Sequence, residues 1–405
     1  MADTILVINA GSSSIKFSLY AIAGGTWLQR CMKGQIDGIG ERPRLNVRNG
    51  SGKTLIDYSW SDTEVSDLSA ALDRISAFLR DQLGDELPVA VGHRVVHGGP
   101  YFDRPAIVDR DVLEKLERLI SIAPLHQPNN IAPIRIVLER LPQILQVACF
   151  DTAFHRGHPM VADRFAIPES LFLEGVRRYG FHGLSYEYIS KRLTEFAPDI
   201  AKGRVVVAHL GSGSSMCAIQ AGRSMETTMG FTTLEGLAMG TRPGQLDAGV
   251  ILYLMTEKNM SPKAIEQFLY HECGLKGLSG ISSDMRELLA STDPRAAMAV
   301  EFFVHRVVLF TGMLTAAMGG IDGFVFTAGI GENAPTVREA IASRLSWLGI
   351  EFDSVANDAG QCVVSTPASR VACYVIPTDE EQMIASHTFR VLKERQRLRV
   401  QSGAN

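Results

Sequence analysis

The sequence lacks the cysteine pattern of a disulfide-stabilised or zinc-binding protein. Its 405 residues include six cysteines, which contain no C-x-x-C pair and lie mostly among apolar neighbours, as is typical of reduced thiols in a core. No positively charged segment precedes the first apolar run, so a secretory signal is not predicted. We therefore expect a cytoplasmic protein.

An excess of charge of either sign is also missing. The 40 basic and 44 acidic residues leave a formal net charge of -4 at pH 7, which offers no overall field for nucleic acid or an anionic membrane. We therefore expect a small-molecule partner, with no nucleic acid and no membrane. An anionic substrate would have to be bound by a few placed residues.

No apolar run is long enough to span a bilayer. The longest, residues 307–321, falls short of the ~20 residues that a spanning helix needs, and Arg306 and Asp322 flank it. We predict a buried helix there. The composition, 46% apolar and 21% charged, is that of an ordinary globular protein whose length suits two or three domains.

An internal repeat organises the chain. Residues 5–20 predict two short strands joined by a loop of glycine and serine. Residues 205–220 repeat this pattern, so that Gly11 and Gly211 correspond. A repeat of this kind predicts two related domains.

Strands alternate with helices between and after these hairpins, which favours α/β layers. The predicted strands are 89–96, 146–150, 323–327 and 371–376, and the predicted helices are 110–122, 248–256, 262–270, 295–318 and 335–348, with a helical tail from Glu381. We interpret the charged end of that tail, residues 393–397, as a solvated face.

The two repeated loops are candidate phosphate sites, the alternative for each being an ordinary turn. Their backbone N–H groups and hydroxyls, with the ammonium of Lys16, suit polyphosphate oxygens and the water shell of magnesium. A nucleotide held by both loops would explain the repeat. Residues 49–54 end like a P-loop, but Val47 stands where that motif needs glycine, so we predict a hairpin turn there.

Two other segments have the composition of helix N-termini, which attract anions. Residues 283–287 include a candidate cap pair, Asp284 and Glu287, and residues 328–333 precede Pro335, a favourable first helical residue. A well-capped helix with no ligand is the alternative for each.

Single polar residues beside glycines and strand ends are further candidates. Arg94 and Arg242 each end an apolar run beside glycine, where a guanidinium can clamp a carboxylate or phosphate, although a surface turn is the alternative. Asp151 directly follows a predicted strand, where α/β folds place ligand-facing residues, although a helix cap is the alternative.

Two histidine pairs have the spacing of metal sites. They are His93 with His97 and His155 with His158, but no cysteine or glutamate completes either set. We predict structural roles for most of these histidines.

Six motifs taken in order resemble the acetokinase family, within the superfamily of acetate and sugar kinases, heat-shock ATPases and actin. The motifs lie at residues 7–16, 92–99, 150–155, 179–183, 282–286 and 329–333. The resemblance implies an α/β fold of two duplicated ribonuclease-H-like (actin-like ATPase) domains around an interdomain cleft, usually in a homodimer. It places residues 1–151 and the C-terminal helix 383–405 in the first domain, and residues 152–382 in a nucleotide-binding domain.

The resemblance implies reversible, Mg²⁺-dependent transfer of the ATP γ-phosphoryl group to acetate, giving acetyl phosphate and ADP, with Mn²⁺ as an alternative metal. The catalytic residues it suggests are Asp151, His182 and Arg242. For the substrate it suggests Arg94, Val96, Leu125, His126, Phe181 and Thr233. For ATP it suggests Lys16, His209, Leu210, Gly211, Ser212, Gly213, Asp284, Met285, Arg286, Gly329, Ile330, Gly331, Glu332 and Asn333. For the metal it suggests Asn9 and Glu380.

Four positions depart from the usual family pattern. Ser212 replaces an asparagine of the second loop, Gln245 an aspartate, Ala248 a proline, and Thr233 a proline near the expected substrate pocket. Affinity and acyl-chain preference are therefore left open.

Two other functions are left open. A propionate or butyrate kinase would differ only in the acyl pocket. A nucleotide-switched chaperone or filament protein would explain the paired loops, but not two arginines and a histidine among the site residues.

Overall fold

The computed structural model describes residues 3–11, 13–84 and 86–402, which fold into two compact units. Unit 1 contains the chain up to Ala153 and again from Asp379, and unit 2 runs from Phe154 to Thr378. The division expected from the sequence, at 151 and 382, differs from these boundaries by a few residues. Ser12 of the first loop and the last three residues of the predicted C-terminal helix lie outside the described residues.

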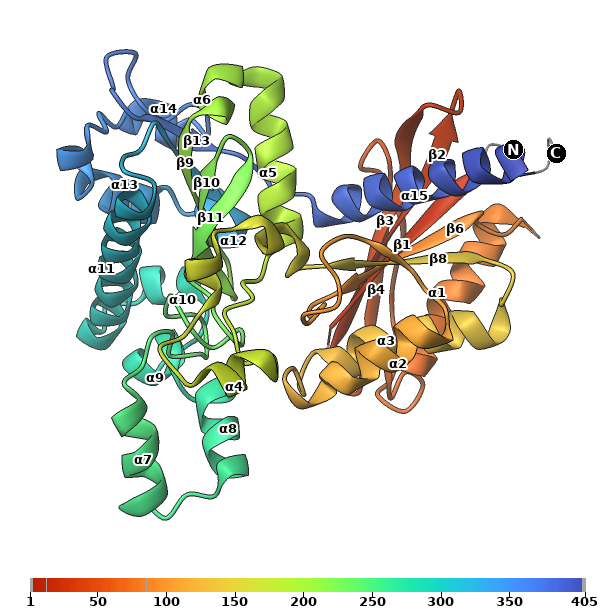
Figure 1. The fold of residues 1–405 in the computed structure, drawn as a ribbon, viewed down its shortest axis with the longest axis horizontal. Helices are drawn as coiled ribbons and strands as arrows, with labels where there is room; N and C mark the ends of the chain where they lie inside the picture. The colour runs from red at the N-terminus through yellow and green to blue at the C-terminus, as the bar shows by residue number, and fades with distance from the viewer. Residues whose placement is uncertain (1–2, 12, 85, 403–405) are drawn as a thin grey trace. The chain divides into compact units, whose positions relative to one another are not determined.

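Unit 1 is built on a sheet with the strand order β5-β4-β3-β2-β1-β6-β8-β7 (Figure 1). The strands are β1 (Thr4–Ala10), β2 (Ser14–Ala23), β3 (Trp27–Asp37), β4 (Arg44–Asn49), β5 (Thr54–Ser59), β6 (Ala90–Val95), β7 (Ala106–Ile107) and β8 (Leu145–Phe150). Strands β1 to β5 form an antiparallel meander, whereas β1, β6 and β8 are parallel. The turn between β4 and β5 confirms the predicted hairpin at residues 49–54.

Helices cover both faces of this sheet. They are α1 (Leu68–Leu83), α2 (Arg110–Arg118), α3 (Gln127–Arg140) and α15 (Glu380–Ser402). Helix α15 packs across β1, β6 and β8, and α1 and α3 pack on the opposite face. Gly92 on β6 permits the approach of α15, because a Cβ atom there would lie 2.3 Å from Thr388 Oγ1 and 2.7 Å from Ile384 Cγ2.

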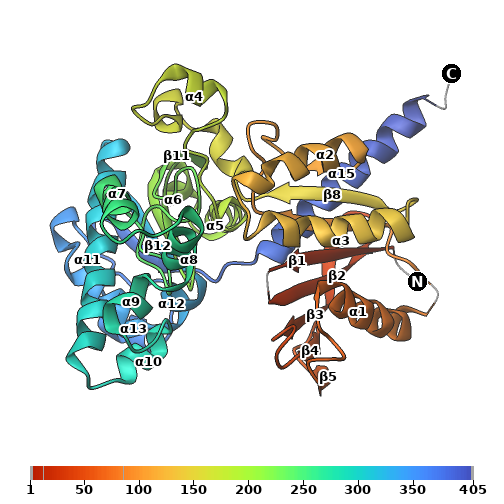
Figure 2. The same cartoon turned by 90° about the horizontal axis from the view of Figure 1, so that it is seen from below.

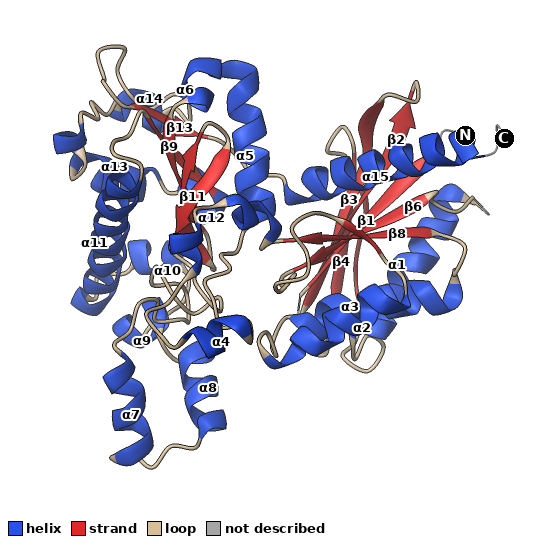
Figure 3. Cartoon of the chain, in the orientation of Figure 1, coloured by secondary structure: helices blue, strands red, loops and turns tan. Residues whose placement is uncertain are grey.

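Unit 2 repeats the central topology of unit 1. Its sheet has the order β11-β10-β9-β12-β13. The strands are β9 (Arg204–Leu210), β10 (Ser214–Gln220), β11 (Arg223–Thr227), β12 (Gly323–Thr327) and β13 (Ala372–Val375). Strands β9 to β11 are antiparallel like β1 to β3, and β9, β12 and β13 are parallel like β1, β6 and β8. The predicted duplication is confirmed, and each sheet lies among helices in Figure 3.

The alternating side chains of β9 separate two cores in unit 2. Val206, Ala208 and Leu210 belong to a cluster with α11, while Val205 and Val207 pack with α5. Figure 2 shows α9, α10, α11 and α13 gathered on one side of this unit. The helices are α4 (Glu169–Leu173), α5 (Gly183–Phe196), α6 (Pro198–Lys202), α7 (Ala248–Thr256), α8 (Pro262–His271), α9 (Gly274–Ser279), α10 (Met285–Ala290), α11 (Pro294–Ala317), α12 (Ala328–Asn333), α13 (Pro335–Ser343) and α14 (Ser354–Asp358).

Helix α11 contains most of the apolar run that we expected to be buried. Phe303, Val307 and Leu314 pack in the core, but Leu309 and Met313 are exposed on the other face, so the expectation was right for one face only. Within the described part of the chain, α11 is the one helix whose length and apolar composition would allow it to cross a membrane.

Two predicted helices end earlier than expected, each in a 3-10 turn. The segment 110–122 leaves the α conformation after Arg118, and the segment 335–348 does so after Ser343. In the second case Leu345 and Leu348 are both buried, which a tighter turn allows.

Candidate functional site

The carboxyl ends of three parallel strands in unit 1 bring Asn9, Arg94 and Asp151 together. Arg94 Nη2 lies 2.6 Å from Asp151 Oδ2, and Arg94 Nε lies 3.2 Å from Asp151 Oδ1. Arg94 Nη1 donates to Asn9 Oδ1 at 3.2 Å. Asn9 and Asp151 are buried. Neighbouring parallel strands end at the same sheet edge, which explains how residues far apart in sequence form this cluster.

The first turn of α15 adds two carboxylates to the same cluster. Glu380 Oε2 lies 3.6 Å from Arg94 Nε, and Glu381 Oε2 lies 3.5 Å from Lys33 Nζ. Burial and the nearby Asp151 carboxylate raise the pKa of Glu380 to about 7, although Arg94 opposes this. Burial alone would lower the pKa of the Arg94 guanidinium, but Asp151 and Glu380 raise it above its ordinary value.

These residues fit a magnesium ion by their chemistry. Asn9 offers an amide oxygen, and Glu380 stands among carboxylates that disfavour its ionisation. A divalent cation would relieve that crowding, and Mg²⁺ takes hard oxygen donors. No group of three or more His, Cys, Asp or Glu side chains arranged to hold a metal occurs within residues 3–11, 13–84 and 86–402. Water and phosphate would therefore complete the coordination.

Asn130 on α3 supports this strand edge and was missed by the sequence analysis. Its Oδ1 accepts from Val96 N at 2.8 Å and its Nδ2 donates to Ala10 O at 2.8 Å, so one buried side chain joins the ends of β1 and β6. The available signal was a polar residue on the same helical face as Ile134.

The other predicted residues of unit 1 lie near this edge of the sheet or beside α3. Val96 is buried directly after β6. Leu125 and His126 precede α3, with His126 at the position before its first residue. Lys16 on β2 pairs in register with Asn9 and has an exposed side chain.

In unit 2, His182 and Arg242 flank the second glycine loop. A Cβ atom on Gly213 would lie 2.8 Å from Arg242 Nη2 and 3.5 Å from His182 Nε2. His182 precedes α5 in a left-handed conformation, with φ of 57°. Its Nδ1 is hydrogen-bonded to Ser215 Oγ at 2.8 Å. Glycine at position 213 thus leaves room for a ligand to approach two polar side chains.

Arg242 is a partly buried cation in an unusual setting. Its Nη1 donates to Thr233 O at 2.8 Å, and the described residues give it no carboxylate partner. Burial lowers the pKa of Arg242 to about 10. A bound anion would compensate this charge. Of the residues predicted for the substrate, Thr233 and Phe181 are buried in this unit.

The predicted ATP residues begin at the end of β9. The ring of His209 stacks on that of His182, with centroids 4.2 Å apart and planes at 18°. His209 Nδ1 is hydrogen-bonded to Ser185 Oγ at 2.9 Å, and Leu210 lies in the core. The next two residues, Gly211 and Ser212, line a cavity.

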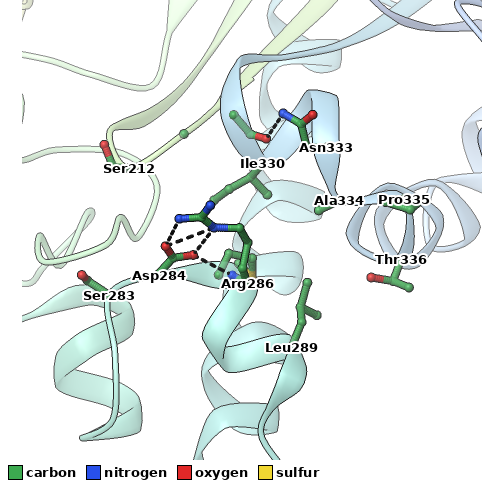
Figure 4. Close-up of a pocket in the computed structure, with 13 residues that line it drawn as sticks. Ser212, Ser283, Asp284, Arg286, Leu289, Ile330, Asn333, Ala334, Pro335 and Thr336 are labelled. Carbon is green, nitrogen blue, oxygen red and sulfur yellow. Dashed lines mark hydrogen bonds and ion pairs between the residues drawn. The ribbon is translucent and has the colours of Figure 1, made fainter. Parts of the chain in front are cut away.

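That cavity has a volume of about 490 Å³ and is shown in Figure 4. Its lining combines the glycine loop, the start of α10 and the segment from α12 to α13. The lining residues are Gly211, Ser212, Ser283, Asp284, Met285, Arg286, Leu289, Gly329, Ile330, Asn333, Ala334, Pro335 and Thr336. Its size suits a nucleoside.

The cap at the start of α10 differs from the expected pair. Asp284 Oδ1 accepts from Arg286 N at 2.8 Å, but Asp284 N donates to Ser282 Oγ at 3.0 Å instead of to Glu287. The guanidinium of Arg286 also meets the Asp284 carboxylate, with Nε 3.0 Å from Oδ1 (Figure 4). Because the Arg286 side chain is 89% exposed, it can turn toward a ligand at low cost.

Some predicted ATP residues do not line the cavity. Gly331 is buried, and Glu332 Oε1 accepts from Ala328 N and Thr378 N, at 2.8 and 3.1 Å. Glu332 therefore organises the backbone of α12. Five lining residues were absent from the predicted ATP set, namely Ser283, Leu289, Ala334, Pro335 and Thr336. Of these, Ser283 and Pro335 had been noted at predicted helix starts.

The histidine pairs have structural partners, as predicted. His155 lies between Ser224 Oγ and Phe181 O, at 2.8 and 3.0 Å, and burial lowers its pKa to about 3. His158 Nε2 lies 2.6 Å from Asp163 Oδ1. His93 Nε2 lies 2.8 Å from the side-chain amide of Gln146.

Comparison with known proteins agrees with this arrangement. The acetokinase family profile matches residues 4–386. The chain is 58% identical over 393 residues to an acetate kinase of Nitrobacter hamburgensis, covering 97% of each protein. It is 56% identical over 390 residues to an acetate kinase of Rhizobium meliloti, covering 96% of this chain and 98% of that protein.

Solved structures give the same result. A propionate kinase from Francisella tularensis has a TM-score of 0.88 and 36% identity, covering 95% of this chain and 99% of that one. An acetate kinase from Porphyromonas gingivalis has a TM-score of 0.85 and 36% identity, covering 96% and 100%. By sequence along nearly its whole length and by fold, the chain belongs to the acetokinase family.

Proposed function

We propose that this chain transfers the γ-phosphoryl group of ATP to acetate, giving acetyl phosphate and ADP in a reversible reaction. ATP-dependent phosphorylation of acetate is the activity that its membership of the acetokinase family supports. The structural observation that carries the proposal is a pair of side chains at Gly213. Arg242 Nη2 and His182 Nε2 converge there, beside the glycine loop that is a candidate phosphate site.

The substrate needs positioning more than deprotonation. A carboxylate is already ionised at neutral pH, so catalysis rests on alignment and on charge stabilisation. Arg94 holds the acetate carboxylate, with Val96, Leu125, His126, Phe181 and Thr233 around the acyl group. That list follows the family resemblance. Asp151, engaged by Arg94 through both oxygens, orients the guanidinium and acts less as a base.

The residues that stabilise charge on the transferring phosphoryl group lie in unit 2. The Arg242 guanidinium and the His182 imidazole stabilise that charge from beside the loop 211–213. The nucleoside occupies the 490 Å³ cavity, with Asp284 and Arg286 on one side and residues 329–333 on the other. The triphosphate follows the glycine loop, with Lys16 and His209 as further contacts.

We propose Mg²⁺ as the metal, with Mn²⁺ as a substitute, held by Asn9 and Glu380. When bound, the ion neutralises phosphate charge and fixes the orientation of the triphosphate. Asn9 Oδ1, which accepts from Arg94 Nη1, has a second lone pair that could reach the ion. Glu380 would ionise more readily beside the cation.

Hydroxylamine trapping tests the reaction directly. The protein is incubated with ATP, Mg²⁺ and acetate, and acyl phosphate is trapped as the hydroxamate. Formation of acetohydroxamate that depends on both acetate and ATP supports the proposal, and the Arg94→Ala variant provides the matched control. Acetate-independent ATP hydrolysis without hydroxamate would instead favour a nucleotide-switched ATPase.

Propionate is a second candidate substrate. The F. tularensis structure is named a propionate kinase and has 36% identity and a TM-score of 0.88. Thr233 also replaces the proline that is usual near the acyl pocket. The same hydroxamate assay with propionate and butyrate separates these activities.

We propose a homodimer in the cytoplasm. Apolar side chains on α7 and α11, among them Leu252, Tyr253, Met298 and Leu309, are exposed in the single chain and would suit a subunit interface. All six cysteines lie in the described residues and are thiols outside any disulfide, in keeping with a reducing compartment. Sedimentation analysis of the purified protein tests the subunit number.

A further inference from the structure

A chain of three hydrogen-bonded side chains lies behind His182. Tyr186 OH lies 2.5 Å from Ser215 Oγ, and Ser215 Oγ lies 2.8 Å from His182 Nδ1. Tyr186 stands four residues after His182 on α5, and Ser215 comes from β10, so a helix and a strand hold the ring between them. None of the roles assigned above uses Ser215 or Tyr186.

Burial fixes the direction of the hydrogen bond between Tyr186 and Ser215. Tyr186 and Ser215 are fully buried, and Ser215 Oγ is the hydrogen-bond partner that the described residues provide for the phenol. If Ser215 donated to Tyr186, the phenolic proton would be left without an acceptor in the core, which is unfavourable. Tyr186 therefore donates to Ser215, and Ser215 is free to donate to His182 Nδ1.

We infer that Tyr186 and Ser215 are positioning residues that hold His182 in the tautomer with its proton on Nε2. Nδ1 accepts from Ser215, so the ring carries its N–H at the edge that faces Gly213. There the Nε2–H and the Arg242 guanidinium form two donors beside the glycine loop. The opposite tautomer would present a lone pair to the phosphoryl oxygens. The inference rests on the proposed function for the role of His182.

The backbone and the neighbours of His182 also restrict the orientation of its ring. His182 has φ of 57°, a left-handed conformation that a non-glycine residue adopts only when its surroundings require it. The preceding carbonyl, Phe181 O, accepts from His155 Nε2 at 3.0 Å, and His155 is buried. The ring face is also covered, since His209 stacks on it.

Nitrogen-15 NMR of histidine-labelled protein tests the inference without relying on activity. Spectra are recorded on the ligand-free full chain at mildly alkaline pH, where an exposed imidazole is neutral. The ten histidines require an assignment, which the His182→Gln variant supplies by loss of one signal set. We expect His182 to be protonated at Nε2 and unprotonated at Nδ1. A proton at Nδ1 in the parent overturns the inference.

Tyr186→Phe then removes only the phenolic oxygen. We expect a mixture of His182 tautomers and a loss of about fivefold to tenfold in kcat, the size of one hydrogen bond, with an unchanged KM for ATP. Tyr374→Phe is the matched control, because Tyr374 packs in the same core cluster, and it should change neither tautomer nor kcat. If Tyr186→Phe left both tautomer and kcat at parent values, the inference would be wrong.

Ser215→Ala gives a second variant in case the first folds poorly. It should also give a mixture of His182 tautomers. The fall in kcat should be larger, because both His182 and Tyr186 lose a hydrogen-bond partner. A parent that forms no hydroxamate but shows the Nε2–H tautomer would refute the proposed function and leave the hydrogen-bond assignment standing. An active parent with the Nδ1–H tautomer would support the proposed function and overturn the hydrogen-bond assignment.

Discussion

Arg94 and Asp151 face each other through two hydrogen bonds, Nη2 to Oδ2 at 2.6 Å and Nε to Oδ1 at 3.2 Å. Both carboxylate oxygens are thus engaged by one planar guanidinium, which fixes the orientation of the two side chains relative to each other. The geometry supports an orienting role for Asp151, and it leaves Arg94 Nη1 directed at Asn9. The following predictions extend this division of roles.

Arg242→Ala should lower kcat more than it weakens substrate binding. Removal of one preorganised charge stabiliser typically costs ~10²–10³ in kcat. Arg242→Lys should restore only part of the loss, because an ammonium lacks the planar fork that reaches both Gly213 and Thr233 O. Steady-state kinetics of the three proteins decides this, and a near-normal kcat for Arg242→Ala would refute the site assignment.

Glu380→Ala and Asp151→Asn should differ in their response to metal. If Glu380 holds Mg²⁺, its loss should raise the Mg²⁺ concentration needed for half-maximal activity, and excess metal should restore part of the activity. Asp151→Asn should not be restored in this way, because its partner is Arg94. Magnesium titrations of both variants and the parent provide the measurement, and the same metal dependence in all three would argue against separate roles.

The metal-free protein should lose stability as pH rises from 4.5 to 7. Burial raises the pKa of Glu380 from 4.5 to about 7, so in this window the folded state binds the Glu380 proton more tightly than the unfolded state does. Linkage then makes the free energy of unfolding fall with increasing pH from this one group. Glu380→Gln should flatten the dependence, as followed by urea unfolding across that window, and an unchanged slope would contradict the cause.

The acyl-chain preference should be broad but centred on acetate. A methylene is worth ~0.8 kcal/mol on transfer, and a hydrophobic pocket discriminates by ~1–3 kcal/mol per methylene. We expect propionate within about tenfold to a hundredfold of acetate in kcat/KM, and poor use of butyrate. Thr233→Pro keeps the carbonyl that Arg242 contacts, so it should alter the acetate to propionate ratio with little change in the KM for ATP. A parent that prefers butyrate would disprove the acetate assignment.

The sequence predicted best where local signals coincide. Strand 323–327 and helix 248–256 were placed with the bounds that the structure has, because each is an apolar run with a clear stop. Helix α7, for example, begins at the Asp247 cap, which accepts from Gly249 N. Arg94 and Asp151 were singled out because each ends an apolar run, whereas Asn9 came from the family resemblance.

Contacts between elements that are distant in sequence were not predictable in this way. Asn130 joins two strand ends only because α3 packs beside them, and Ser215 meets Tyr186 only where β10 lies against α5. The lining residues Ser283 and Thr336 likewise owe their place to two segments that converge. Such contacts depend on how helices and strands pack together, which local residue patterns do not reveal.

The placement of α15 against Gly92 has a consequence for biosynthesis. Unit 1 needs a helix that follows unit 2 in the sequence, whereas all of unit 2 is continuous. On the ribosome, unit 2 can therefore complete its fold first, while the sheet of unit 1 keeps one face uncovered until α15 has been synthesised. Arg94 then meets Glu380 as one of the last events of folding, so a chain released early would be inactive and, with that face exposed, prone to aggregate.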